Sequence, residues 1–131
     1  MIDDYGHNPT EIAAALETAR ELEPRALVAV YQPHVYERTR QLHHELAAAL
    51  GRADAVIVTD VIDGRDARIP GVSGKLVLDR VPAPTRRGWA PTLEDASTLA
   101  LAWVRPGDVV VTLGVGEPWR IARAVAEGLP A

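Results

Sequence analysis

Three short apolar segments restrict the fold of this sequence more than any other feature. They are Ala26–Tyr31, Ala55–Thr59 and Asp108–Leu113, and in none of them do apolar and polar residues alternate. Strands with this pattern are buried on both faces, as in a parallel sheet covered by helices. The third segment also contains three consecutive valines, which favour a strand. We therefore expect these segments to form the central strands of an α/β protein.

Helical patterns alternate with these strands. The clearest begins at Asn8, which suits the N-cap, with Pro9 in the first helical position and Glu11 placed to complete a capping box. Further helices are predicted over about 36–50, from a cap at Thr92, and over about 118–129. The alternation predicts βαβ units and a mostly parallel sheet with helices on both faces. Residues 72–81 fit either a short helix or a strand, and Trp89 suits a short edge strand.

Composition excludes several classes of protein. The 131 residues suffice for one domain, and no repeat or second domain boundary is visible. Fourteen basic against eighteen acidic residues give a net charge of −4, which argues against nucleic-acid or anionic-membrane partners. The absence of cysteine excludes disulfides, thiol nucleophiles and cysteine-bound zinc. No apolar run approaches the roughly 20 residues of a membrane span, and no signal peptide is present, so we expect a cytoplasmic protein.

Ligands of parallel sheets bind beyond the carboxyl ends of the strands. His34 follows the first buried strand closely, and Arg38 lies four residues further on. The two side chains would share a helix face if the helix begins by His34. Together they would suit a carboxylate, to which arginine can donate two parallel hydrogen bonds. A capped helix start with a solvated arginine explains the same residues equally well.

A polar segment, 3–8, precedes the first helix. A helix N-terminus attracts anions, so His7 could donate to an anion and Asp4 could meet ribose hydroxyls or a magnesium-bound water. The alternative is that these residues only stabilise the start of the helix.

Gly114-Val115-Gly116 joins the last strand to the last helix. It lacks the third glycine of a dinucleotide-binding loop, because position 119 is tryptophan, and the sequence has no Walker A motif. We expect a tight turn that brings backbone close to a small ligand. The aspartates of 60–66 have no spacing specific for a metal. Lys75 is the only lysine, so phosphate chemistry has little support in this sequence.

Five landmarks in sequence order resemble the C-terminal domain of the Mur ligase family, closest to its UDP-N-acetylmuramate–L-alanine ligases. Residues 3–12 are similar to D-D-Y-G-H-H-P-T-E-I, and residues 32–39 to Q-P-H-R-Y-S-R-T. Residues 59–61 and 69–74 match two further landmarks, and residues 114–117 stand where the family has G-A-G-D.

This resemblance implies a Rossmann-like domain, residues 1–131, excised from a three-domain enzyme. The first domain of such a ligase binds the UDP-sugar, and the central domain holds ATP and Mg2+. The enzyme activates the muramate carboxyl as an acyl phosphate, which the amine of L-alanine attacks, in peptidoglycan precursor synthesis. The isolated domain is then expected to be inactive. Because the family signature normally follows a strand, we also expect that a first strand was lost ahead of Met1.

The resemblance also implies roles for individual residues. Asp4 would lie near the nucleotide, and no catalytic residue or metal ligand is expected within this domain alone. The residues expected near the substrate are Tyr5, His7, His34, Arg38, Gly114 and Gly116.

Two departures from the family pattern leave alternatives open. Asn8 replaces a histidine, and Val35 replaces an arginine that could meet a carboxylate. The alternatives are a muropeptide-recycling ligase and a stand-alone, non-catalytic Rossmann-like binding module. A P-loop encoded upstream of Ile2 would favour a ligase, and a natural start at Met1 would favour the module.

Overall fold

The computed structural model describes residues 2–4, 6–62, 68–114 and 118–128 of the chain. The elements in chain order are β1 Ile2–Asp4, α1 Pro9–Arg20, β2 Leu27–Tyr31, α2 Tyr36–Leu50, β3 Ala55–Val58, α3 Gly74–Leu78, β4 Arg86–Trp89, α4 Leu93–Trp103, β5 Val109–Leu113 and α5 Trp119–Gly128. Helices and strands alternate as the sequence predicts, with one additional strand at the start.

The strands form one sheet in the order β1-β5-β2-β3-β4, and each neighbouring pair is parallel. The three predicted central strands form the middle of the sheet, with Val28 of β2 level with Val110 of β5 and with Ala55 of β3. β4, with Trp89, is an edge strand, as predicted. The parallel sheet and its burial on both faces are thus confirmed.

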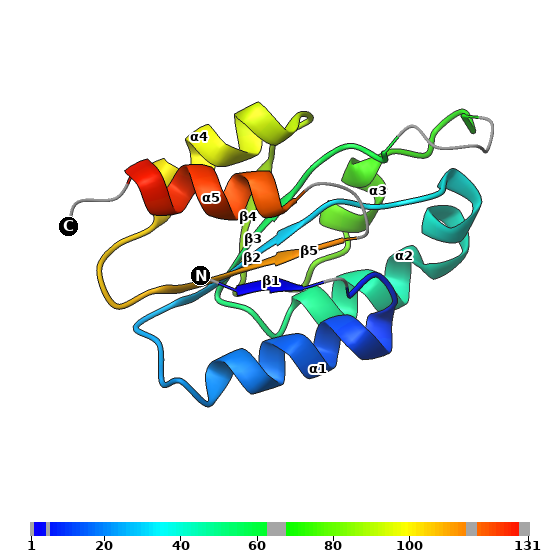
Figure 1. Ribbon diagram of the computed structural model, residues 1–131. Coiled ribbons are helices and arrows are strands. Elements are labelled where there is room, and N and C mark those ends of the chain that lie inside the picture. The colour runs from blue at the N-terminus through cyan, green and yellow to red at the C-terminus, as the bar shows by residue number, and fades with distance from the viewer. Residues whose placement is uncertain (1, 5, 63–67, 115–117, 129–131) are drawn as a thin grey trace.

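Helices cover both faces of the sheet, as Figure 1 shows. Successive residues of β2 enter two different cores. Leu27, Ala29 and Tyr31 pack in the cluster that contains residues of α1, α2 and α3. Val28 and Val30 pack in the cluster that contains residues of α4 and α5. Burial on both faces explains why β2 shows no polar alternation in sequence.

The described residues begin with a strand, β1, that the sequence pattern did not mark. Ile2, Asp3 and Asp4 of β1 pair with Val111, Thr112 and Leu113 of β5. The strand is short and contains two aspartates, so it lacks the apolar run that marks a central strand. Charged residues are common on edge strands, where they discourage pairing with another chain.

The ambiguous segment 72–81 forms a helix, α3. The Ser73 side chain caps it by accepting a hydrogen bond from the Lys75 backbone N–H at 3.2 Å. The structure therefore settles the choice in favour of a short helix.

Asp54 lies just before β3, at the end of the sheet where the strands begin, and it connects the ends of α1 and β2. Its Oδ2 accepts hydrogen bonds from the Leu27 N–H at 2.7 Å and from Arg20 at 2.9 Å. Burial alone would raise the pKa of Asp54, but the hydrogen bonds from Arg20 and Leu27 outweigh it and hold that pKa below its usual value. The carboxylate therefore contributes to stability in its charged form.

Replacing Asp54 with asparagine is expected to lower the free energy of unfolding by about 1 kcal/mol at neutral pH, a modest value because the pair with Arg20 is half-exposed. Because the pKa of Asp54 is lower in the folded state, its carboxylate stabilises the fold at pH values above the pKa that it has in the unfolded chain. This stabilisation is lost as the pH falls through the folded-state pKa. The difference in the free energy of unfolding between wild type and Asp54→Asn should therefore become smaller toward about pH 3. Urea unfolding at neutral pH and at about pH 3 measures this difference, and Asp79→Asn, at an exposed position, serves as the control. An equal difference at both pH values would contradict this account.

Candidate functional site

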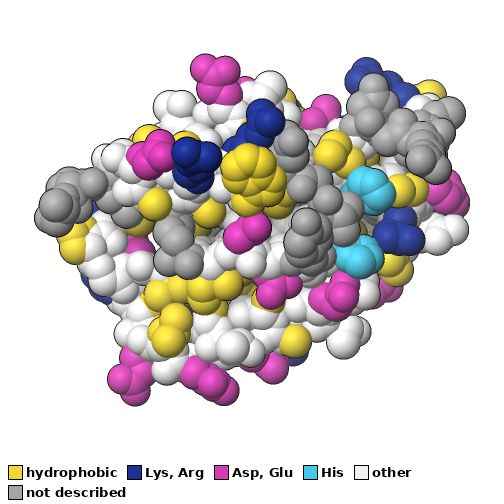
Figure 2. Space-filling model, in the orientation of Figure 1, with side chains coloured by type: hydrophobic (Ala, Val, Ile, Leu, Met, Phe, Trp, Pro, Cys, Tyr) yellow, Lys and Arg dark blue, Asp and Glu magenta, His cyan; other side chains and the backbone are white. Residues whose placement is uncertain are grey.

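The candidate site lies along the carboxyl edge of the sheet, where backbone hydrogen bonds continue beyond the strands. The Gly114 N–H donates to the Asp4 carbonyl at 3.2 Å, and the Gln32 N–H donates to the Leu113 carbonyl at 3.0 Å. The segments that follow β1, β5 and β2 therefore lie side by side. Figure 2 shows histidine side chains and a basic side chain gathered at the end of the molecule toward which the strands run in Figure 1.

His34 lies at this edge but not on α2. It forms a parallel bridge with Ile62, and α2 begins only at Tyr36. The helix therefore does not begin by His34, so the condition under which His34 and Arg38 would share a helix face is not met. The physical reason is Val35, whose φ of 67° departs from the helical path. His34 is half-buried at the sheet edge, and Arg38 is exposed on the first turns of α2.

The structure instead places the charge of Arg38 near the phenol of Tyr31. Tyr31 ends β2 and is only 2% exposed. Burial raises the pKa of the Tyr31 hydroxyl well above its usual value, and the nearby Arg38 charge opposes that rise only in part. The phenol is thus a neutral hydrogen-bonding group beside a cation. The sequence pattern marked Tyr31 only as a strand residue.

His7 is held by the first turn of α1. Asn8 caps the helix as predicted, since its Oδ1 accepts a hydrogen bond from the Glu11 N–H at 2.9 Å. The Glu11 carboxylate reaches back to His7, lying 3.2 Å from the imidazole Nδ1 and 3.3 Å from the backbone nitrogen. The orientation of His7 is therefore tied to the start of the helix.

The two adjacent aspartates of β1 have different surroundings. The Asp3 side chain accepts a hydrogen bond from the Thr112 hydroxyl at 2.6 Å, which gives it a structural role. The Asp4 Oδ1 accepts one from the Gly6 N–H at 2.7 Å. Asp4 also lines a cavity of about 350 Å³ between β1 and α1, together with Glu11. Of the two, Asp4 is the one that borders an open space.

Gly114 follows β5, and the rest of the predicted turn, 115–116, lies outside the described residues. The φ of Gly114 is +139°, and a Cβ at this position would lie 2.9 Å from the Gln32 carbonyl oxygen and 3.4 Å from the Pro118 ring. Only glycine allows the backbone to approach Gln32 this closely. Tyr5 and Gly116, also expected near the substrate, lie outside the described residues.

Gln32 is a polar residue of the site that sequence analysis passed over. It is 8% exposed, and its side-chain oxygen has no hydrogen-bond partner among the described residues. Unpaired buried polar atoms are rare in folded proteins. Its signal in the sequence was a polar side chain directly after a fully buried strand.

Asp60, after β3, connects two elements. Its Oδ1 accepts hydrogen bonds from the Val61 N–H at 2.8 Å and the Gly74 N–H at 3.2 Å. It borders a cavity of about 280 Å³ that Tyr36 and Ser73 also line. The carboxylate thus fixes the start of α3 against the end of β3.

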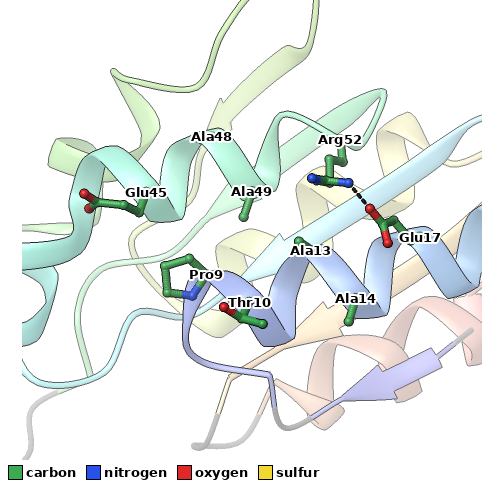
Figure 3. A pocket seen from close by; sticks show the side chains of 9 residues that line it. All are labelled: Pro9, Thr10, Ala13, Ala14, Glu17, Glu45, Ala48, Ala49 and Arg52. Carbon is green, nitrogen blue, oxygen red and sulfur yellow. Dashed lines mark hydrogen bonds and ion pairs between the residues drawn. The ribbon is translucent and has the colours of Figure 1, made fainter.

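A further cavity of about 490 Å³ runs between α1 and α2 (Figure 3). Four alanines form much of its lining, and an ion pair between Arg52 and Glu17 borders it. Because it offers few groups that could orient a charged substrate, we do not place the functional site there.

Metal-binding and lysine groups are sparse among the described residues. These residues include no group of three or more histidine and acidic side chains able to hold a metal ion. The single lysine, Lys75, places its ammonium over the Trp89 ring, 5.5 Å from the centroid.

The parallel sheet and its two helical layers define a Rossmann-like α/β domain, a fold whose ligands commonly bind at the carboxyl edge of the sheet. Residues 1–116 match the family model described as Mur ligase, glutamate ligase domain, so the chain belongs to this family. No helix in the described ranges is long and apolar enough to cross a membrane.

Comparisons with individual proteins show the same relationship. The chain is 44% identical over 132 residues to UDP-N-acetylmuramate–L-alanine ligase of Symbiobacterium thermophilum, covering 98% of this chain and 27% of that protein. The crystal structure of UDP-N-acetylmuramate–alanine ligase from Thermotoga maritima matches with a TM-score of 0.73 at 27% identity, over 94% of this chain and 25% of that one. A murein peptide ligase from Psychrobacter arcticus also has a TM-score of 0.73, over 97% of this chain and 27% of that one; at 17% identity it shows the fold alone. The chain thus spans about a quarter of these relatives.

Proposed function

We propose that this chain is the C-terminal domain of an ATP-dependent UDP-N-acetylmuramate–L-alanine ligase that acts in cytoplasmic peptidoglycan precursor synthesis. The observation that carries the proposal is the 44% identity to such a ligase along 98% of the chain. In this proposal the N-terminal domain binds UDP-N-acetylmuramate, and the central domain holds ATP and Mg2+. The chain described here closes over them and supplies the side of the site that receives L-alanine.

The carboxyl edge suits the binding of an amino acid. Arg38 is exposed and forms no hydrogen bond or ion pair with the other described residues, so its guanidinium is free to bind a carboxylate with two parallel hydrogen bonds. The neutral Tyr31 phenol and the half-buried His34 imidazole offer further donors near the end of β2. These groups would orient the amino acid so that its amine attacks the acyl phosphate formed on the muramate carboxyl.

The residues at the end of β1 suit the nucleotide side of the closed enzyme. Asp4 borders the cavity between β1 and α1, and its carboxylate could accept hydrogen bonds from ribose hydroxyls. His7, held by Glu11, stands at the N-terminus of α1, where an anion is favoured. The proposed roles of Tyr5, Gly114 and Gly116 as substrate neighbours follow from their motifs.

We favour an alanine ligase over a muropeptide-recycling ligase because substantial sequence identity supports the first, whereas the murein peptide ligase shares only the fold at 17% identity. A full-length enzyme that ligates L-alanine and rejects the tripeptide L-alanyl-γ-D-glutamyl-diaminopimelate would support this choice. The opposite preference would replace it.

The chain alone is expected to show no turnover, because in this proposal ATP and Mg2+ are held by the central domain. The 131-residue chain would be mixed with ATP, Mg2+, UDP-N-acetylmuramate and L-alanine, and phosphate release would be measured. Release should equal the blank, while the full-length enzyme at the same molarity serves as the positive control. Alanine-dependent release by the chain alone would refute its assignment as one part of a three-domain catalyst.

A further inference from the structure

Val35 has an unusual backbone conformation, with φ 67° and ψ 116°. Positive φ is uncommon for any residue other than glycine, and for a β-branched residue it is an outlier, because the side chain crowds its own backbone. Strained residues of this kind concentrate at functional sites and persist only where the surrounding structure fixes them. Val35 lies between His34 and α2, inside the candidate site.

The structure holds the chain firmly on both sides of Val35. On the N-terminal side, the Pro33 carbonyl accepts a hydrogen bond from the Ile62 N–H at 2.9 Å, and His34 bridges to Ile62. On the C-terminal side, the Val35 carbonyl accepts hydrogen bonds from both the N–H and the hydroxyl of Thr39, at 3.0 and 2.9 Å. Tyr36 is also buried, in a cluster with two valines. These contacts leave Val35 to absorb the change of direction.

A comparison with Glu23 shows that this conformation is special to the site. Glu23 is the other described residue besides glycine with a positive φ, 52°. It follows α1, and its N–H donates to the Arg20 carbonyl at 3.0 Å, as in the left-handed turns that commonly end helices. Val35 instead precedes a helix, so helix termination does not explain its conformation.

The conformation of Val35 decides where His34 lies. A right-handed helical φ at Val35 would let α2 begin earlier. His34 would then lie on the helix, about one turn before Arg38. The observed φ instead leaves His34 paired with Ile62 at the sheet edge, while Arg38 stays on the first turns of α2. The two side chains thus reach the edge from two independently anchored elements.

We propose that Val35 is a positioning residue for the amino-acid side of the site, and that its left-handed backbone holds His34 at the sheet edge. The expected effect on the KM for L-alanine rests on the proposed ligase function, whereas the expected effect on the position of His34 does not. Val35 itself need not touch the substrate.

The kinetic test uses the full-length enzyme. Val35→Pro fixes φ at about −65° and so excludes the observed backbone, and we expect it to raise the KM for L-alanine about tenfold, because small misplacements of binding groups have large effects. The KM values for ATP and UDP-N-acetylmuramate should stay within twofold of wild type. Val35→Gly should retain wild-type kinetics, because glycine adopts positive φ without steric cost. Glu23→Gly, at the other positive-φ position, should change none of these constants.

The structural test uses the NMR signals of the His34 ring in the 131-residue chain. Val35→Pro should shift or broaden them and reduce the hydrogen-exchange protection of the Ile62 N–H, whereas Val35→Gly and Glu23→Gly should do neither. If Val35→Pro does not fold, Val35→Gly remains the test, because altered ring signals or an altered KM for L-alanine in that variant would contradict the proposal. Unchanged ring signals in Val35→Pro, or an equal rise in all three KM values, would overturn the proposal. If the His34 ring signals change in the Val35→Pro chain but the full-length wild-type enzyme ligates no alanine, the ligase function is refuted and the positioning role of Val35 stands.

Discussion

Replacing Gly74 with alanine is expected to lower the free energy of unfolding by about 3 kcal/mol or more, a large part of the total stability of a small domain. A Cβ at Gly74 would lie 1.9 Å from the Thr59 carbonyl oxygen and 2.9 Å from the Trp89 ring. The first of these atoms is backbone at the end of a central strand, so it cannot move aside cheaply. The Gly74 N–H also donates to Asp60, so a displaced α3 would weaken that bond as well.

Gly71→Ala provides the matched control for this prediction. Gly71 has a φ of +80°, but a Cβ there would meet nothing within 4 Å. Its replacement should therefore cost only the left-handed penalty of roughly 1–2 kcal/mol. Urea unfolding of both variants separates the steric contribution from the conformational one. Equal losses in the two variants would show that the contact with Thr59 is not the cause.

Local patterns predicted most of the fold because the relevant forces act within short segments. Fully apolar runs marked the strands that both helical layers cover, and Asn8 and Thr92 marked helix starts that the structure confirms. β1 escaped prediction because its pairing with β5 spans nearly the whole chain and its aspartates resemble a loop. The helix at 74–78 was ambiguous because its position depends on contact between Gly74 and Thr59, which no local pattern reveals.

The candidate site was predictable in outline but not in detail. The rule that ligands bind at the carboxyl ends of parallel strands predicted an edge at which the structure places His34, Gln32 and Gly114. That His34 lies outside α2 could not be predicted, because spacing alone assumes a continuous helix, and Val35 interrupts it. Burial and charge decide the state of the Tyr31 phenol, so this group could be recognised only in the folded structure.

Replacing Arg38 with alanine in the full-length enzyme is expected to lower kcat/KM for L-alanine about 100-fold, because hydrogen bonds to charged groups contribute about 1.5–3 kcal/mol each. Arg38→Lys should recover only part of this loss, since an ammonium cannot form the two parallel bonds of a guanidinium. His34→Ala is expected to act in the same direction, with a smaller effect. The KM values for ATP and UDP-N-acetylmuramate should remain near those of wild type in all three variants.

Arg40 offers a matched control two residues along the same helix. Its side chain is exposed like that of Arg38, but it is hydrogen-bonded to Glu37, with Nε 3.0 Å from the carboxylate. Arg40→Ala removes the same charge from α2 and should leave the alanine kinetics unchanged, so a general effect of charge would appear in both variants. If Arg38→Ala and His34→Ala both kept wild-type kinetics for alanine, neither residue would belong to the amino-acid site. The receptor for the carboxylate would then have to be sought on the other domains.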